Sequence, residues 1–348
     1  MVISRRELLK TVGAAGVMGA LPALARAQVD KPEKPSLTIA VGGQALIYYL
    51  PLSVAHLKGY FKDEGLNVTI ADFAGGSKAL QAVVGGSADV VSGAFEHTIS
   101  LQSKGQYYRC FALQGRAPMI VLGVSKKTLP GYKTPADLKG KKIGVTAPGS
   151  STNMMVSFFL DKHGVKPTDV SYVGVGAGAG AVTAIRSGQI DAISNLDPVI
   201  STLVKDDALQ IIADTRTLKD SREIFGGDMP AGCLYASQSF IDANPITTQA
   251  LANAIVRADL WIQSVTPADI AKLVPQSYLL GDPALYELAL KGNREALSPD
   301  GMVPEDGPQT ALNALAAYVP HFDRTKIDLS RIWTNQFAAK ANQKYPHA

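Results

Sequence analysis

An imperfect internal repeat is the feature that most limits how this chain can fold. Residues 74–101, AGGSKALQAVVGGSADVVSGAFEHTISL, align without a gap on residues 176–203 when the chain is shifted by 102 positions. Seven positions are identical: Gly76 and Gly178, Ala79 and Ala181, Ala82 and Ala184, Gly86 and Gly188, Asp89 and Asp191, Ser92 and Ser194, Leu101 and Leu203. Each copy predicts a glycine-rich turn, a short helix, a buried strand and a loop entering a second helix. The repeat therefore predicts two lobes built on one plan.

Strand-like and helix-like segments alternate around both copies. Predicted strands at 37–41 and 66–70 enclose a predicted helix over 47–58. Predicted strands at 142–145 and 170–175 enclose a second helix over 153–163. Alternation of this kind is typical of parallel βαβ units. We expect an α/β fold in which each lobe is a mostly parallel sheet flanked by helices.

Two apolar strands predict where the chain crosses between lobes. Residues 119–124 are expected to be a strand that leads out of the first lobe, and residues 231–236 a strand that returns to it. The first lobe would then comprise 28–124 and 231–348, with 125–230 as an inserted second lobe. Paired crossings are natural hinges, here expected about Val124 and Ala231.

The chain after Asn244 reads as a helical C-terminal tail. Apolar residues recur at helical spacing in four segments separated by proline and glycine: 246–264, 267–273, 284–297 and 309–318. We expect these helices to pack on the first lobe and to hold it to the hinge.

The first 27 residues predict an export signal. Residues 4–10, SRRELLK, form a twin-arginine pattern, and an apolar, alanine- and glycine-rich run leads to an Ala-Arg-Ala cleavage site at 25–27. An uncleaved N-terminal helix is the alternative. We expect cleavage before Gln28 and a periplasmic product.

Charge and cysteine content exclude several classes of function. The formal net charge is +4, but residues 1–27 hold four basic residues and one acidic residue, so the remainder carries about +1. Such a balance gives no basic surface for nucleic acid or an anionic membrane. Cys110 and Cys233 form no metal motif, and the sequence leaves open whether they are buried thiols or a bridge. No cofactor and no metal are expected.

Loops after the predicted strands supply the candidate ligand-binding residues. In open α/β sheets ligands bind beyond the carboxyl ends of the strands, so two facing lobes would place these loops around one cleft. The candidates are Gln44, Tyr48, Gly76, Ser77, Phe95, Glu96, His97, Arg116, Ser150, Ser151, Thr152, Asn195 and Asp197.

Two predicted helix starts carry the clearest chemistry among these loops. Gly76-Ser77 and Ser150-Ser151-Thr152 combine free backbone N–H groups with short hydroxyls, which suits an anion. Each hydroxyl could instead only cap its own helix. Both helices opening towards one cleft favours ligand binding.

The other candidates each have a structural alternative. Arg116 could pair with an acid group, or be a solvated arginine at a strand end. Tyr48 and Phe95 could enclose a ligand, or belong to the core. Glu96 beside His97 suggests acid–base chemistry, although most histidines at helix starts are only hydrogen-bonded.

One motif points to a different class of protein. Gly176-x-Gly178-x-x-Ala181 follows a predicted strand and is followed by Asp197, which is a loose dinucleotide-binding fingerprint. The equivalent stretch in the first copy lacks it, so an element of the lobe is the simpler interpretation. An exported oxidoreductase with a nucleotide cofactor remains the alternative.

The sequence resembles a known family. YYLPLSVAHLKGYFKDEGLNVTIADFAGGSKALQAVVGGSADVV at 48–91, with its GYFKDEGL helix end, GGS turn and G-x-x-D strand, is similar to periplasmic substrate-binding proteins of ABC importers. The branch is the one that binds nitrate, taurine, alkanesulfonates and thiamin precursors. PADLKGKKIGVTAPGSSTNMM at 135–155 resembles that family's second lobe.

The resemblance implies a two-lobed fold of the type II periplasmic binding protein kind and no catalysis. It implies ligand contacts at Gln44, Gly76, Ser77, Phe95, Ser151, Thr152 and Asn195. It also implies delivery of the ligand to an inner-membrane permease by a protein that we expect to be a monomer. The pyrimidine-synthesising relatives carry a cysteine-rich motif that this chain lacks.

We therefore expect a protein that captures a small organic anion, a sulfonate or a carboxylate, between two closing lobes. A pyrimidine or an inorganic anion in the same fold remains an alternative ligand. Glu96 and Asp197 near the cleft favour a ligand that carries an amine or hydroxyl besides its acid group.

Overall fold

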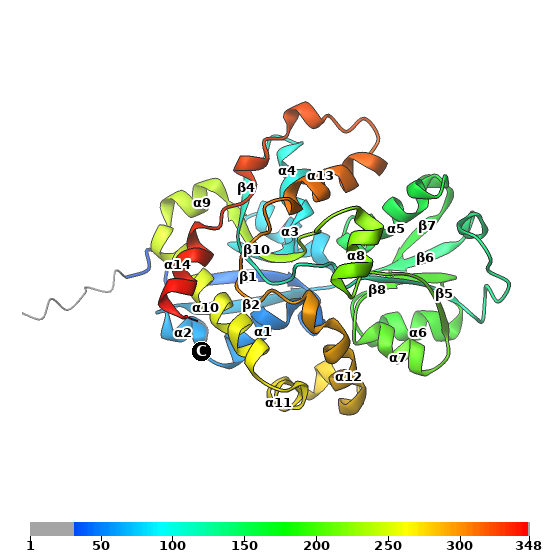
Figure 1. The fold of residues 1–348 in the computed structure, drawn as a ribbon, viewed down its shortest axis with the longest axis horizontal. Coiled ribbons are helices and arrows are strands. Elements are labelled where there is room, and N and C mark those ends of the chain that lie inside the picture. Colours follow the sequence, from blue (N-terminus) through cyan, green and yellow to red (C-terminus); the bar gives the residue numbers. More distant parts are fainter. Residues whose placement is uncertain (1–30, 347–348) are drawn as a thin grey trace, which may run out of the picture. The chain divides into compact units, whose positions relative to one another are not determined.

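The computed structural model describes residues 31–346, which contain two five-stranded sheets flanked by helices (Figure 1). The first sheet has the order β2-β1-β3-β10-β4, with β1 (Ser36–Gly42), β2 (Asn67–Phe73), β3 (Val90–Ala94), β4 (Tyr108–Leu113) and β10 (Gly232–Ser237). The second has the order β7-β6-β8-β5-β9, with β5 (Val121–Ser125), β6 (Lys142–Val145), β7 (Ser171–Gly174), β8 (Ala192–Asn195) and β9 (Leu209–Asp214). We call each sheet with its own helices a lobe. The predicted export signal lies outside the described residues.

The two sheets share one plan. In lobe one β1 pairs in parallel with β2 and β3, and in lobe two β6 pairs in parallel with β7 and β8. One strand of each sheet, β10 or β5, runs antiparallel to both of its neighbours. The predicted α/β architecture of two lobes is confirmed, with mixed sheets.

The antiparallel strands are exchanged between the lobes. Strand β5 follows lobe one in the sequence but pairs with β8 and β9 of lobe two, and β10 follows lobe two but pairs with β3 and β4. The prediction that 119–124 is a strand of the first lobe is therefore wrong. An apolar strand buried on both faces fits either sheet equally well, and the sequence does not distinguish them.

The crossing segments lie just before these exchanged strands. Gly115 and Ala231 pair through their backbones, with Ala231 N donating to Gly115 O at 2.9 Å. Val124, predicted as a hinge, is instead a buried residue inside β5. Met119, in the first crossing, has a φ of 56°.

Helices cover both sheets. Lobe one contains a 3-10 turn over Ile47–Tyr49, then α1 (Leu50–Leu57), α2 (Tyr60–Asp63), α3 (Gly76–Val84) and α4 (Glu96–Gln102). Lobe two contains α5 (Ser151–Lys162), α6 (Ala179–Ser187), α7 (Val199–Lys205) and α8 (Leu218–Phe225). The tail comprises α9 (Gln238–Ala243), α10 (Pro245–Ser264), α11 (Pro267–Leu273), α12 (Pro283–Asn293), α13 (Gly307–Tyr318) and α14 (Gln336–Lys344).

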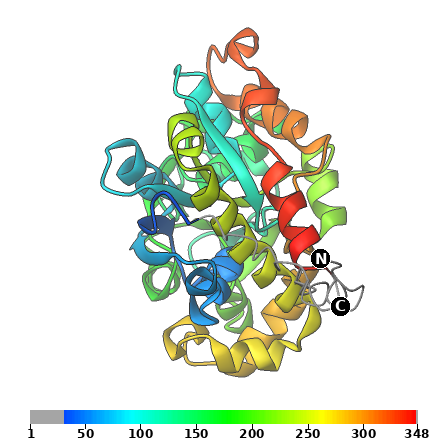
Figure 2. The same ribbon diagram turned by 90° about the vertical axis from the view of Figure 1, so that its left-hand side faces the viewer.

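The tail contacts both lobes. Helix α10 begins at a proline in its first turn, buries most of its length, and packs against α1 and α14 (Figure 2). Helix α13 packs on α4 of lobe one and α5 of lobe two, and α12 packs on α7. The tail thus extends beyond the predicted contact with lobe one. No helix within residues 31–346 is long and apolar enough to cross a membrane.

The repeat has a structural cause. Asp89 accepts the Thr38 N–H at the start of β1 at 2.8 Å, and Asp191 accepts the Lys142 N–H at the start of β6 at 2.9 Å. In each lobe the backbone N–H of the same aspartate returns a bond to the strand it caps. The aspartates of the two copies therefore fix equivalent strand pairs.

Candidate functional site

The predicted loops meet between the lobes. Ile47, after β1, donates its N–H to the Asp197 carbonyl oxygen, after β8, at 3.1 Å. The start of α3 meets the loop between β6 and α5, as described below. The cavity left at this contact is about 10 Å³, room for no more than one water molecule. Its lining residues are Gly42, Leu46, Tyr48, Tyr49, Gly76, Thr146, Ser151, Thr152 and Leu196. We call this region the cleft; in this conformation it is closed.

The two helix starts face each other across the cleft. Ser77 N, in the first turn of α3, donates to Ser150 Oγ at 3.0 Å, and Ser150 is the N-cap residue of α5. Ser150 Oγ also lies 3.2 Å from Ser77 Oγ, which donates to the Pro148 carbonyl oxygen at 2.8 Å. An amide at a helix start, where the partial charge is positive, is thus bonded to an oxygen from the opposite lobe.

Two glycines make this close approach possible. A Cβ on Gly75 would lie 2.9 Å from both N and Cβ of Ala147, and a Cβ on Gly43 would lie 2.4 Å from Ala177 Cβ. Both alanines belong to lobe two. Gly75 itself has an extended backbone, with φ of −172°, so its need for glycine comes only from the facing lobe.

The hydroxyls of Thr152 and Ser151, in the first turn of α5, have different surroundings. Thr152 is buried, and its Oγ1 accepts the Thr146 N–H at 3.0 Å and lies 2.9 Å from Thr146 Oγ1. Ser151 is half-buried and lines the cleft beside it. Thr152 thus supports the loop between β6 and α5.

His97 stands next to the cleft, although it is not among the residues that line the cavity. Its ring Nδ1 lies 3.1 Å from the Tyr235 hydroxyl, and its Nε2 is buried without a partner among the described residues. Its Cε1 would lie 3.5 Å from a Cβ on Gly76, so the ring stands at the start of α3. Burial lowers the pKa of His97 to about 4, an effect partly offset by the Gly149 backbone of lobe two, which lies close to the ring but outside hydrogen-bond geometry. The imidazole is therefore neutral at pH 7.

Glu96 is buried beside this histidine. Burial raises its carboxyl pKa to about 7, and its Oε1 has no partner among the described residues. Tyr48 and Tyr49 contact each other edge to face and surround this region, and burial raises the pKa of both phenols. Phe95 is fully buried in the core of lobe one.

Three predicted residues are engaged in backbone or structural bonds. Gln44 N donates to Asp72 Oδ1 at 2.9 Å. Asn195 donates to the Gly176 carbonyl oxygen and accepts the Leu196 N–H, which uses both ends of its amide. Asp197 accepts from Asn293 Nδ2 at 2.7 Å and from the Ser201 N–H at 2.8 Å.

Arg116 is not brought to the cleft. Its Nε donates to the Glu295 carbonyl oxygen at 2.9 Å, and its side chain lines a separate cavity of about 220 Å³ with Arg222 and Asp228. A strand end fixes where the backbone of Arg116 lies, but not the direction of a long side chain.

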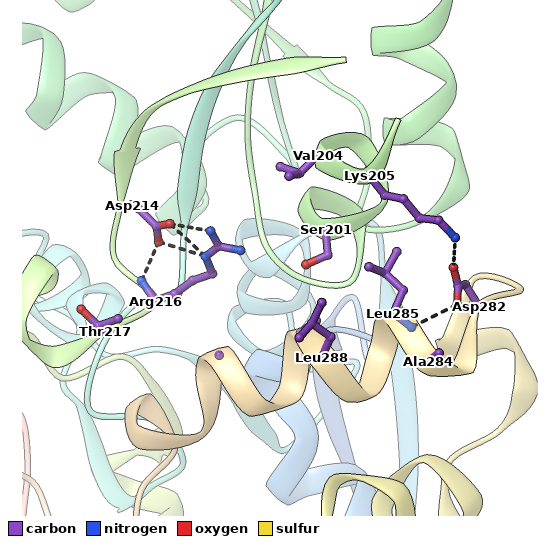
Figure 3. A pocket seen from close by; sticks show the side chains of 12 residues that line it. Ser201, Val204, Lys205, Asp214, Arg216, Thr217, Asp282, Ala284, Leu285 and Leu288 are labelled. Carbon is purple, nitrogen blue, oxygen red and sulfur yellow. Dashed lines mark hydrogen bonds and ion pairs between the residues drawn. The ribbon is translucent and has the colours of Figure 1, made fainter. Parts of the chain in front are cut away.

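A larger groove lies between α7 and α12 (Figure 3). It has a volume of about 780 Å³, and Val204, Leu285 and Leu288 give it an apolar wall. Its charged residues are already paired: Arg216 with Asp214 at 2.6 Å and Lys205 with Asp282 at 2.5 Å. The sequence reasoning missed this groove.

Arg216 was also missed. Its Nη1 lies 3.4 Å from Asp197 Oδ2, so the Arg216 side chain supports the loop after β8 that carries Asp197. The signal was the run Asp214-Thr215-Arg216-Thr217 after an apolar strand, which is typical of a loop at the carboxyl end of a sheet. No group of three histidine, cysteine or acidic side chains within 31–346 is arranged to hold a metal ion.

The nucleotide fingerprint lacks a free acidic group. Asp197, which would bind a ribose, is engaged with Asn293, Ser201 and Arg216. The turn at Gly176 follows β7, which is an edge strand. Ala177, in the same turn, lies against Gly43 of lobe one. These contacts favour the interpretation of this turn as part of the lobe.

Known proteins show the same sequence pattern and fold. The sequence matches the NMT1-like family over residues 30–275. A 4-amino-5-hydroxymethyl-2-methylpyrimidine phosphate synthase of Aspergillus parasiticus is 26% identical over 257 residues, which cover 71% of this chain and 72% of that protein.

Solved structures extend the comparison to the whole fold. A protein of Bordetella bronchiseptica RB50 is 71% identical with a TM-score of 0.91, covering 91% of this chain and 100% of that chain. The alkanesulfonate-binding protein SsuA from Xanthomonas axonopodis pv. citri, solved bound to MOPS, has a TM-score of 0.68 at 19% identity and covers 88% of this chain and 99% of that one. The fold is thus the two-lobed fold of periplasmic binding proteins. Because the family match spans most of the sequence, this chain belongs to the NMT1-like family.

Proposed function

We propose that this protein is a solute-binding protein that captures a small organic anion, a sulfonate or a carboxylate, between its two lobes. The observation that carries the proposal is the bond from Ser77 N to Ser150 Oγ at 3.0 Å. It joins the start of α3 to an oxygen of the facing lobe, and an acid-group oxygen would take the place of that hydroxyl.

The Nε2 of His97, which makes no hydrogen bond within residues 31–346, supports the same position for the ligand. A buried polar atom without a partner costs free energy, which a bound acceptor would recover. In the groove between α7 and α12, by contrast, Arg216 and Lys205 already have carboxylate partners. The cleft is therefore the better site for an anion.

The fold also supports a role in import. We propose that the mature chain works in the periplasm after twin-arginine export, as a monomer that delivers its ligand to an ABC permease. The structural likeness to an alkanesulfonate-binding protein supports this role. We propose no catalytic step, although the synthase relatives make a pyrimidine the alternative ligand to test.

A thermal-shift screen of the mature chain tests the proposal. Sulfonates, aromatic and aliphatic carboxylates, nitrate and pyrimidines are compared, since a ligand that binds only the folded state raises the melting temperature. A rise with sulfonates or carboxylates supports the proposal. A rise only with pyrimidines, or a flavin or nicotinamide absorbance band in the purified protein, would overturn it.

A pair of variants tests the position of the ligand. Ser77→Pro removes the one N–H that faces Ser150, at a helix position where proline is tolerated, and Gly76 has no Cβ to clash with the proline ring. Ser77→Ala keeps that N–H. Loss of a hydrogen bond to a charged group is expected to weaken affinity by about tenfold or more in Ser77→Pro relative to Ser77→Ala. Equal affinities would place the ligand elsewhere.

A further inference from the structure

The two cysteines of the chain lie on neighbouring strands of lobe one. Cys110 is in β4 and Cys233 is in β10, and these strands pair antiparallel. Cys110 lies opposite Tyr235 and Cys233 lies opposite Leu113, so the two thiols are diagonal neighbours across the pair. Directly opposed residues share a face of the sheet, and so do residues two apart in one strand, so both thiols are on one face. Both are buried, and both are free thiols within residues 31–346.

The thiols lie close enough to affect each other. Burial raises the pKa of Cys233 well above its usual value, and the neighbouring Cys110 thiol raises it further. The proton therefore stays on the Cys233 sulfur at neutral pH. Since the thiolate is the form that attacks a disulfide, this thiol is protected while the strands stay paired. A reaction that joins the two sulfurs needs a local opening of the strand pair.

The edge of the sheet provides a route to that opening. Strand β4 is the last strand of its sheet, and residues 332–334 cover its outer edge. Cys110 N donates to the Ile332 carbonyl oxygen at 2.9 Å, and Thr334 N donates to the Cys110 carbonyl oxygen at 2.9 Å. Release of this segment would leave β4 held in the sheet by β10 alone. Local openings of such edges cost less free energy than global unfolding, and they allow the strands to shift until the sulfurs meet.

The cysteine pair lies at the base of both crossings between the lobes. Cys233 follows Gly232, whose carbonyl oxygen accepts the N–H groups of Gln114 at 2.6 Å and Gly115 at 3.0 Å. Every strand and helix of lobe two, from β5 to α8, lies between the two cysteines in the sequence. A bond between the sulfurs would therefore enclose lobe two in one covalent loop. It would also tie the two crossing segments together where they leave lobe one.

We propose that Cys110 and Cys233 form an oxidation site, at which one intramolecular disulfide closes the loop that contains lobe two. Each thiol gives up its hydrogen as the S–S bond forms. The two electrons and two protons pass to a disulfide oxidant, which becomes two thiols. The periplasm is oxidising, whereas the cytosol keeps thiols reduced, so the inference rests on the proposed location of the mature chain for its setting. It does not depend on which ligand the cleft binds.

A glutathione titration of the purified mature chain tests this site. The protein is equilibrated in mixtures of oxidised and reduced glutathione, then denatured, and its free thiols are alkylated and counted by mass spectrometry. Mild denaturant during equilibration speeds the opening of the edge, so that a slow reaction is not mistaken for no reaction. Reduced glutathione should leave two alkylated cysteines and oxidised glutathione none, with both lost in a single two-electron step. Peptide mapping without reductant should then recover the two cysteine-containing peptides as one linked species.

The bond should also raise the melting temperature. A disulfide stabilises mainly by restricting the unfolded chain, and more so when the loop is long, as it is here with a whole lobe inside it. The oxidised protein should melt about 5 °C or more above the reduced protein. Cys110→Ala and Cys233→Ala each remove one partner, and neither variant should show this difference between oxidising and reducing buffer.

Several results would overturn the inference. They are two free thiols in oxidised glutathione, a wild-type protein that carries glutathione on either cysteine in place of the linked peptides, or equal melting temperatures of the two forms. A redox-dependent shift that persists in both alanine variants would do the same. None of these results bears on the proposed function, because the thermal-shift screen for ligands is run on the reduced protein. Absence of any anion ligand in that screen would instead overturn the proposed function and leave the disulfide in place.

Discussion

At the scale of single residues, buried polar atoms that have no partner within residues 31–346 occur both at the cleft and in the tail. His97 Nε2 and Glu96 Oε1 lie at or beside the cleft, where a ligand or opening of the lobes can satisfy them. Asp259, in α10 of the tail, is different: both of its carboxylate oxygens are buried near Gly301 without a partner among the described residues. Such a group affects stability and has no place in the proposed binding.

Asp259 predicts a pH-dependent stability. Burial, helped by the nearby Asp300, raises its pKa well above the usual value. As pH rises above about 4, the unfolded chain ionises this group while the folded chain keeps it protonated, so stability falls until the folded pKa is reached. Asp259→Asn should remove that fall and raise the free energy of unfolding at pH 7, by about 1.4 kcal/mol per unit of pKa elevation.

Urea unfolding at several pH values checks this prediction. The gap between Asp259→Asn and wild type should close in acid and widen towards neutral pH. Asp242→Asn, at an exposed position of α9, is the matched control and should show no gap. A gap that does not depend on pH would show that Asp259 is ionised in the folded protein.

At the scale of elements, the repeat is explained by strand caps and not by a duplicated binding site. Asp89 and Asp191 hold equivalent strands, and Gly86 and Gly188 have left-handed φ values of 78° and 81°. The helix starts differ: α3 presents Ser77 directly, while α6 is preceded by glycines and the hydroxyls of lobe two come from α5. The lobes share a scaffold but contribute unequal parts to the cleft.

Loss of either capping aspartate should therefore destabilise the fold without altering binding. Asp89→Ala and Asp191→Ala each leave a backbone N–H unpaired at a strand start, which should cost about 1–3 kcal/mol of unfolding free energy. Denaturant titration measures the loss and calorimetry measures ligand affinity. A variant of full stability but weak binding would contradict the structural role.

Closure of the lobes depends on the approach of α3 to lobe two. In Gly75→Ala the added Cβ meets Ala147 at 2.9 Å, a contact that exists only when the cleft is closed. Ligand affinity should fall by about tenfold or more, with little change in the melting temperature of the ligand-free protein. Gly131→Ala is the control, because its Cβ would meet nothing within 4 Å.

Small-angle scattering checks the same variant directly. Ligand should reduce the radius of gyration of wild type and of Gly131→Ala. The radius of gyration of Gly75→Ala should keep its ligand-free value. Compaction of Gly75→Ala to the wild-type dimensions, at wild-type affinity, would show that closure does not require this contact.

At the scale of the whole molecule, local sequence patterns predicted the helices and strands. Contacts between distant segments decided which sheet a strand joins and where a long side chain points. The two-lobe plan, the helix starts and Asp89 followed from spacing and turn residues, which act over a few positions. The sheet that receives β5 and the direction of the Arg116 side chain depend on contacts distant in sequence. No single segment of the sequence predicts the groove between α7 and α12. The same is true of the packing of the tail helices α12 and α13 on lobe two.

In the proposed function an organic anion binds to the start of α3, between the lobes. The most direct test of this binding is an amide NMR titration of the isotope-labelled mature protein with methanesulfonate. We expect a saturable shift of the Ser77 amide, with the neighbouring amides of Ser151 and Thr152 following at the same ligand concentration. Shifts confined to Ser201 and Leu288, which line the groove, or no saturable shift at Ser77, would contradict it.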